Sequence, residues 1–403
     1  MEYVERNPMG QQRSLLNEPA DFSLVLGGPL YQLYLRTRLA TPTLDLLRRR
    51  IIGISLIAWL PLLLLTAFAG QVVSGVAVPF LFDLDAHARF LGSLPLMIAA
   101  EMIVHQRIRL IVKQFLDRDI IAPEDRLRFE GIIASAMRLR NSVLVEVLLV
   151  VFVFTVVHWV WRGYITLAVA TWYAAAIDGQ THLTPAGYWY ALVSLPIFRF
   201  VLFRWYFRLF IWYRFLWQVS RLPLRVSALH SDRAGGLGFL AGSVLAFAPV
   251  LVAHTMFLAG LIANQIWHQG ATLPDFKLEI AAVMALLMLL VLAPLTFFVG
   301  HLARAKRTAT REYGIVASRY VEDFRRKWIE GTPGAETLVG SADIQSLADL
   351  SNSFDVVRET RLLPFGRETV VQLAIMIALP LLPLALTMIS VEEIIDRLVK
   401  MAL

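Results

Sequence analysis

Apolar stretches of membrane-spanning length recur along this chain, and no other feature constrains its fold as strongly. A helix needs about 20 apolar residues to cross the hydrocarbon core of a bilayer. Seven stretches reach or approach that length: 51–70, 89–107, 143–161, 188–203, 238–265, 280–301 and 370–388. Because 57% of the 403 residues are hydrophobic, a soluble class is excluded. We therefore expect an all-α polytopic membrane protein with seven transmembrane helices and helical cytoplasmic extensions.

Basic residues indicate how these helices are oriented. With the N-terminus inside the cell, 32 of the 38 Lys and Arg residues fall in cytoplasmic segments, as the positive-inside rule requires. The predicted parts are a cytoplasmic N-terminal segment, a six-helix bundle with two cytoplasmic loops, a cytoplasmic helical segment, and a seventh span with an outer tail. They correspond to residues 1–50, 51–303 with loops 107–142 and 204–237, 304–369, and 370–403.

Two apolar regions have more than one interpretation. The run Gly163–Ile177 is short for a span, so we interpret it as an outer helix or a re-entrant piece. The seventh span contains Pro380 and Pro383, which leave a re-entrant hairpin open as an alternative.

The polar segment after the sixth span has a helical pattern. Its aromatic and apolar residues recur at three- and four-residue spacing, in Tyr313, Val316, Tyr320, Phe324 and Trp328. This periodicity predicts that the sixth span continues into the cytoplasm as an amphipathic helix. A second helix is expected to begin at Ser341.

No pattern in the sequence indicates a cofactor, a metal or a nucleic acid. The chain has no cysteine, its eight histidines form no HxxxH or HxxHH cluster, and GxSxG, GxGxxG and Walker sequences are absent. The net charge of +7 follows from the basic cytoplasmic loops and is no argument for nucleic-acid binding. The expected partners are the lipid bilayer, including anionic phospholipid, and further copies of this chain.

Ionisable residues within apolar sequence form the first candidate site. Glu101 and Glu146 are the acidic residues deepest in the spans, and an ionised group in hydrocarbon is costly without a partner. We expect them to pair with Arg199 and Arg204 of the fourth span. The pairs either hold the helices in register or line a path for ions or protons. His254, in the fifth span, is expected to be a hydrogen-bonded packing residue rather than a ligand.

The segment from His230 to Gly238 forms the second candidate site. Its glycines permit positive φ angles and expose successive N–H groups next to the start of the fifth span. This combination predicts an anion-binding concavity for a phospholipid headgroup, a free phosphate or a carboxylate of the same chain. A tight helix entry capped by Ser231 or Asp232 is the structural alternative. The candidate residues are His230, Asp232, Arg233, Gly235, Gly236 and Gly238.

Three sequence phrases and the overall plan resemble known membrane proteins. FSLVLGGPLYQLYLR, WLPLLLL and HSDRAGGLGFL resemble a group of bacterial inner-membrane proteins, which implies an inner-membrane location. Seven spans with the N-terminus inside the cell then place the C-terminus in the periplasm. The plan is similar to that of insect chemoreceptor-type channels, with long fourth and sixth spans and a cytoplasmic helical layer. That similarity implies a tetramer held by the cytoplasmic layer and a pore lined by the last span, which lacks the family's tyrosine-containing signature here.

These features together favour one function over two others. Charge across several spans, proline-interrupted helices and an assembly-competent cytoplasmic layer lead us to expect an oligomeric channel or small-solute transporter. A membrane enzyme that acts on a lipid phosphate at the glycine-rich segment is the first alternative. A non-catalytic scaffold or signalling subunit is the second.

Overall fold

The computed structural model is almost entirely helical, and it describes residues 22–29, 32, 46–157, 171–177, 180–330 and 341–388. Within these residues, six helices are long and apolar enough to cross a membrane. They are Leu47–Phe68, Leu84–Asp117, Pro185–Val219, Gly238–Gln269, Leu273–Ile329 and Arg367–Met388. The chain is therefore built as a multi-pass helical membrane protein.

Several of the six helices contain short 3₁₀- or π-helical segments, labelled η. The first four are α3 (Leu47–Phe68), α4 (Leu84–His87) with η2 (Ala88–Ser93) and α5 (Leu94–Asp117), α9 (Pro185–Trp189) with η5 (Tyr190–Ser194) and α10 (Leu195–Val219), and η6 (Gly238–Leu240) with α11 (Ala241–Gln269). The last two are η7 (Leu273–Phe276) with α12 (Lys277–Leu292), η8 (Ala293–Phe298), α13 (Val299–Phe324) and η9 (Arg325–Ile329), and α15 (Arg367–Ala378) with η10 (Leu379–Met388). Shorter elements are η1 (Phe80–Phe82), η3 (Pro123–Asp125), α6 (Arg126–Arg140), α7 (Val143–Phe152), η4 (Val153–Val157) and α14 (Ala342–Glu359).

Of the seven predicted spans, the third is the one that the structure does not confirm. Its described part is α7 continued by η4, an apolar helix that is shorter than the six spans. The rest of that predicted span, up to Trp161, lies outside the described residues. The structure thus supports six spans and does not confirm a seventh.

A two-stranded hairpin replaces part of the helix or re-entrant piece expected at Gly163–Ile177. β1 (Ala174–Ile177) pairs antiparallel with β2 (Gln180–Leu183), with Ala174 opposite Leu183. The prediction of a helix is therefore wrong for the last four residues of that run; its first residues lie outside the described part. The dipeptide Asp178-Gly179 between the strands is a typical hairpin-turn sequence, and it was the signal for this correction.

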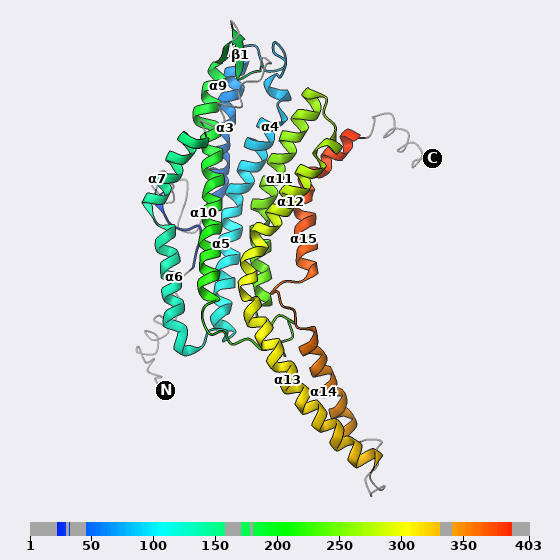
Figure 1. Ribbon diagram of the computed structural model, residues 1–403. Coiled ribbons are helices and arrows are strands. Elements are labelled where there is room, and N and C mark those ends of the chain that lie inside the picture. Colours follow the sequence, from blue (N-terminus) through cyan, green and yellow to red (C-terminus); the bar gives the residue numbers. More distant parts are fainter. Residues whose placement is uncertain are drawn as a thin grey trace, which may run out of the picture.

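The centre of the bundle is formed by α5, α10 and α11, with α3, α12 and α15 around them (Figure 1). Trp205, Trp212 and Phe215 of α10 are almost completely buried in this centre. α11 approaches α4 closely at Gly260, where a β-carbon would overlap the Ala88 side chain. The aromatic pattern of α10 thus serves core packing as well as contact with the membrane.

Two long helices leave the bundle at one end. α13 continues directly from α12 and η8, and α14 returns beside it, so the two project away from the other helices (Figure 1). The predicted continuation of the sixth span is present, and α14 begins at Ala342, next to the expected start at Ser341. Below, the α13–α14 end is the end from which these helices project, and the hairpin end is the one that carries β1 and β2.

Candidate functional site

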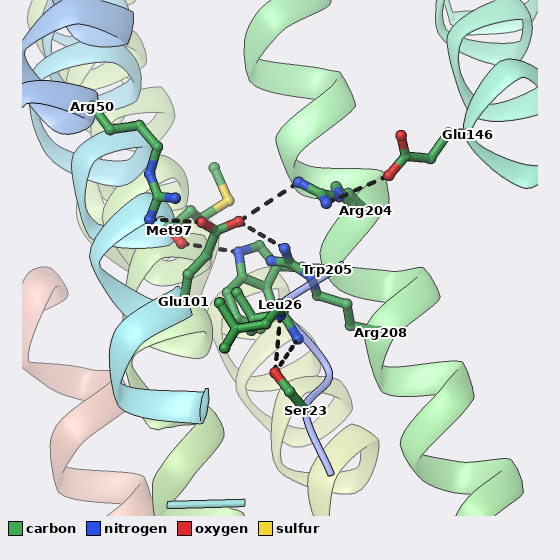
Figure 2. A network of polar contacts seen from close by, with 10 residues as sticks. Ser23, Leu26, Arg50, Met97, Glu101, Glu146, Arg204, Trp205 and Arg208 are labelled. Atoms are coloured by element: carbon green, nitrogen blue, oxygen red, sulfur yellow. Dashed lines mark hydrogen bonds and ion pairs between the residues drawn. The ribbon is translucent and has the colours of Figure 1, made fainter. Parts of the chain in front are cut away.

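A first buried ion-pair cluster is centred on one carboxylate of α5 and is shown in Figure 2. Glu101 accepts a hydrogen bond from Arg208 Nη2 at 2.7 Å, and it forms ion pairs with Arg50 Nη2 at 2.9 Å and Arg204 Nη1 at 3.7 Å. Arg204 and Arg208 lie four residues apart, which places both on one face of α10. Arg50 comes from the first turn of α3, so this cluster joins three helices.

The second glutamate joins the same cluster from α7. Glu146 Oε1 lies 3.4 Å from Arg204 Nη2, and Figure 2 shows Arg204 between the two glutamates. We call Arg50, Glu101, Glu146, Arg204 and Arg208 the Glu101 cluster. Their exposed fractions are between 1% and 8%. Ion pairs this deep are costly to desolvate, and removal of one partner leaves a buried charge, which makes the cluster a strong constraint on helix register.

The N-terminal segment closes this cluster from the α13–α14 end. Ser23 Oγ accepts the N–H groups of Val25 and Leu26 at 3.1 and 2.9 Å. Arg140 Nη1, at the end of α6, donates to the Ser23 carbonyl oxygen at 2.6 Å. Burial, and then the charge of Arg204, lowers the pKa of Arg140 to about 10. Arg140 therefore stays charged at neutral pH and adds to the positive charge beside the cluster.

The sequence-based pairing is present only in part. Both glutamates contact Arg204, as expected. The expectation for Arg199 needs correction, because this residue lies beside Arg89 and the neutral Tyr190 hydroxyl, nearer the hairpin end. Arg208 was missed although its spacing from Arg204 was visible. Arg50 was missed because it belongs to the basic run from Arg48 to Arg50, directly before the first predicted span, where positive charge is expected for orientation alone.

A second buried cluster, near the hairpin end, was not predicted at all. Arg89 Nη2 donates to Asp85 Oδ2 at 2.5 Å, and Arg89 Nη1 donates to the Tyr190 hydroxyl at 3.2 Å. Asp83 caps α4 and accepts Trp172 Nε1 at 2.8 Å. We call these five residues the Arg89 cluster. Its sequence signal was the polar run DLDAHAR, in which Asp85 and Arg89 stand four residues apart.

The backbone around the Arg89 cluster departs from regular α-helix on both sides. Arg89 lies in the π-helical segment η2, and Tyr190 begins the π-helical segment η5. A π-helical turn inserts one residue and rotates the following side chains, and such turns are frequent at functional sites. Here they turn Arg89 and Tyr190 toward each other across two helices.

A cavity of about 340 Å³ adjoins the Arg89 cluster. Its wall is formed by Asp85, Arg89, Tyr173, Tyr190, Phe198, Arg199, Leu202, Phe203 and Phe257. The guanidinium of Arg89 lies 4.7 Å from the centre of the Phe257 ring and 5.6 Å from that of Phe198. The cavity thus combines two cations and one carboxylate with aromatic walls. That combination suits a small ligand with a polar end and an apolar body.

Tyr173 contributes a hydroxyl to the wall from the hairpin end. Burial, and then the negative charge of Asp83, raises the pKa of Tyr173 to about 12. Its hydroxyl therefore stays protonated across the physiological range. It is able to donate a hydrogen bond to a ligand in the cavity.

His254 lies apart from both clusters. Its Nδ1 lies 2.6 Å from the Val250 carbonyl oxygen and its Nε2 lies 2.8 Å from the Tyr206 hydroxyl. Nδ1 donates to the carbonyl oxygen, which accepts only, and Nε2 shares a hydrogen bond with the Tyr206 hydroxyl. This geometry links α11 to α10 and agrees with the expectation of a packing residue.

The anion concavity predicted at His230–Gly238 is occupied by a carboxylate of the same chain. Asp232 accepts the backbone N–H groups of Ala234, Gly236 and Gly238 at 2.8, 3.1 and 2.9 Å. His230 Nδ1 lies 3.0 Å from Asp232 Oδ1. The loop turns on positive φ angles, 65° at Gly235 and 90° at Gly236. Of the three occupants left open, the structure shows the intramolecular one.

The electrostatics of this loop are local. Burial acts to raise the pKa of Asp232, but the three backbone donors and His230 lower it, and the net shift is downward. The carboxylate is therefore ionised at neutral pH and uses the N–H groups that a phosphate would need. This removes the main support for lipid-phosphate chemistry at the loop.

The loop also holds the segment between α14 and α15. Arg361 donates from its backbone N–H to the Arg233 carbonyl oxygen at 2.7 Å and from Nη2 to the Asp232 carbonyl oxygen at 2.8 Å. The buried hydroxyl of Thr360 donates to the Ala228 carbonyl oxygen at 2.8 Å. Arg233 also forms a salt bridge with Glu359 at 2.8 Å. These contacts make the loop the joint between the projecting helices and the last span.

Neither metal ligation nor similarity to known proteins assigns a role to these sites. Within the described ranges, no group of three or more His, Cys, Asp or Glu side chains converges as metal ligands would. No protein-family model matches the chain, and no curated protein or solved structure is significantly similar to it. The function is therefore argued from geometry.

Proposed function

We propose that this protein is a membrane channel or small-solute transporter whose solute site is the cavity beside Arg89 and Arg199. The cavity itself is the observation that carries the proposal. It lies between spanning helices, and its volume of about 340 Å³ is within the usual range for small-molecule sites. Charged side chains within a membrane bundle commonly mark a solute pathway.

The lining of the cavity favours a small organic anion. The wall carries two guanidinium groups, Arg89 and Arg199, and one carboxylate, Asp85, which forms a short ion pair with Arg89. Three phenylalanines and Leu202 supply apolar surface beside these charges. A carboxylate with a compact apolar or aromatic body matches both features.

Two further structural features support transport. Helices that surround the cavity contain the π-helical segments η2 and η5, where a change in helical register needs little rearrangement.

On α13, Ile315, Val316 and Val321 are 48%, 52% and 51% exposed outside the bundle, which supports assembly into an oligomer. Native mass spectrometry of the detergent-solubilised protein tests assembly, and a monomer would contradict it. In this proposal the α13–α14 end faces the cytoplasm of a bacterial cell.

The test uses small carboxylates as probes. Purified protein is titrated with butyrate, benzoate and indole-3-acetate, and uptake of each is measured in proteoliposomes; benzamide and benzylamine serve as neutral and cationic counterparts. Arg199→Gln removes one charge from the wall and is expected to weaken carboxylate binding about tenfold. Arg214→Gln, at the far end of α10, is the matched control and should bind as the wild type does.

Two outcomes would contradict the proposal. One is that no carboxylate binds or is taken up more than in protein-free liposomes. The other is that benzamide binds as well as benzoate, or that Arg199→Gln and Arg214→Gln behave alike. Either result would leave the cavity without a role in solute recognition.

A further inference from the structure

α7 stands away from α10 and leaves an apolar furrow between the two helices, which are far apart in sequence but adjacent in Figure 1. Two hollows of about 240 and 400 Å³ make up this furrow and share Val150 and Phe200. The α7–α10 furrow is lined by Pro29, Val143, Glu146, Val147, Val150, Val151, Val153, Phe154, Leu192, Val193, Pro196, Ile197 and Phe200. Apart from Glu146, the described residues of its lining are all apolar.

Two contacts tie α7 to α10 along the furrow. The rings of Phe152 and Phe203 meet edge to face with centroids 5.1 Å apart, and Glu146 forms its ion pair with Arg204, the next residue of α10. On the α10 side the furrow continues from here toward the hairpin end, as far as Leu192 of η5. Val147 and Val151, which line it on α7, are 52% and 50% exposed. Among the described residues, the furrow is therefore accessible from the side of the bundle.

The length and depth of the furrow match one leaflet of a bilayer. Residues 143–154 of α7 and η4 span about 17 Å at about 1.5 Å per residue. Half of a hydrocarbon core is about 15 Å thick. The polar end of the furrow, at Glu146, is linked through Arg204 and Glu101 to Arg50 in the first turn of α3, where a headgroup region is expected. An acyl chain that enters beside Glu146 would therefore run along the furrow to Phe154.

Charge at the polar end favours an anionic headgroup. Glu146 pairs with Arg204, whereas Arg140 packs beside it through the N-terminal segment: the Arg140 guanidinium lies against Gly27 and the Glu146 carboxylate against Gly28. Among the described residues, the hydrogen-bond acceptors of Arg140 are the uncharged Ser23 carbonyl oxygen and Asn141 Oδ1. A phosphate at this position would compensate the charge of Arg140 at the place where the apolar furrow begins.

We propose that the α7–α10 furrow binds the acyl chain of an anionic phospholipid from the leaflet at the α13–α14 end, with its phosphate beside Arg140. This site is distinct from the solute cavity and goes beyond the proposed function. It also replaces the glycine-rich loop as the site for a lipid headgroup, because Asp232 already occupies the N–H groups of that loop. The lipid would hold α7 against α10.

The test is an equilibrium titration of the delipidated full-length protein in detergent, read by native mass spectrometry. Phosphatidylglycerol and phosphatidylcholine with identical acyl chains are compared. Because a basic side chain near an anionic lipid contributes about 1 kcal/mol, we expect phosphatidylglycerol to bind about five- to tenfold more tightly. Equal affinity for the two lipids in the wild-type protein would overturn the proposal without any variant.

Two matched pairs of variants locate the site. Val147→Trp fills the furrow and should lower phosphatidylglycerol affinity about tenfold, whereas Leu286→Trp on the lipid-facing side of α12 should leave it unchanged. Arg140→Gln should abolish the preference for phosphatidylglycerol, whereas Arg138→Gln, an exposed charge on the same helix, should retain it. If Val147→Trp does not fold, Val151→Trp tests the same volume. Equal behaviour within either pair would overturn the proposal.

Discussion

The Glu101 cluster and the Arg89 cluster lie on the same two helical rods, Leu84–Asp117 and Pro185–Val219, yet their surroundings differ. Around Glu101, three arginines converge on one carboxylate, and each member of the cluster is less than 9% exposed. Around Arg89, one arginine pairs with Asp85 and has Asp83 as a second acidic neighbour, and Arg89 and Asp85 contribute to the wall of a cavity. The first arrangement is saturated with protein partners, whereas the second leaves room for another molecule.

Buried charge alone therefore does not identify a binding site. Both clusters contain short ion pairs within apolar sequence, and both would be selected by a search for ionisable residues in membrane helices. The features that separate them are the cavity and the π-helical segments that turn Arg89 and Tyr190 toward it. We therefore propose that the Glu101 cluster holds the helices in register and that the Arg89 cluster recognises a solute.

The largest expected effect comes from breaking the saturated cluster. Glu101→Gln leaves Arg50 and Arg208 buried without their main counter-charge and should lower the free energy of unfolding by about 3–5 kcal/mol. Unfolding of the purified protein in detergent, followed by tryptophan fluorescence, measures this loss. Glu130→Gln on α6 is the control, because its 3.9 Å pair with Arg126 is exposed and should contribute at most about 0.5 kcal/mol. A similar small effect for both variants would show that the cluster does not hold the helices.

A smaller loss of stability is expected at the open cluster. In Asp85→Asn, Arg89 keeps the Tyr190 hydroxyl and gains access to water in the cavity, so the loss should be about 2 kcal/mol. The variant also raises the positive charge of the cavity wall, and benzoate should bind about threefold more tightly. Parallel unfolding and binding measurements separate the two effects. A loss as large as that of Glu101→Gln, with unchanged benzoate binding, would make the two clusters equivalent.

The smallest effect on stability is expected at Asp232, a carboxylate at the surface of the bundle that already accepts three backbone hydrogen bonds. Asp232→Asn weakens three backbone hydrogen bonds and should lower the free energy of unfolding by about 1 kcal/mol. The folded-state pKa of Asp232 lies below its unfolded value of about 3.9. Its stabilisation is therefore complete above that value and is lost as the pH falls through the folded pKa.

Unfolding curves at successive pH values from neutral to about 3 test this sign, since carboxylates titrate in that range. The stability difference between the wild type and Asp232→Asn should shrink as the pH falls. A difference that is constant with pH would mean that the carboxylate charge does not stabilise the loop.

Much of the fold was accessible from local sequence properties. Apolar stretches of sufficient length predicted the six helices of spanning length found among the described residues, because backbone groups in hydrocarbon must be paired within a helix whose length and composition the local sequence sets. The spacing of aromatic residues after His301 predicted the continuation into α13. The glycines between Asp232 and Gly238 predicted a concavity that binds an anion, since positive φ angles and exposed N–H groups are local properties.

The partners of buried charges depended on how the helices pack. Arg199 and Arg204 lie five residues apart on one helix, but the rotation of α10 places the first beside Arg89 and the second between Glu101 and Glu146. Arg50 reaches Glu101 only because α3 begins at that height. The cavity and the α7–α10 furrow likewise arise from gaps between helices distant in sequence. Composition and periodicity thus determined that this chain forms membrane helices with charged cores, whereas contacts between helices determined which charges are satisfied and which face an open site.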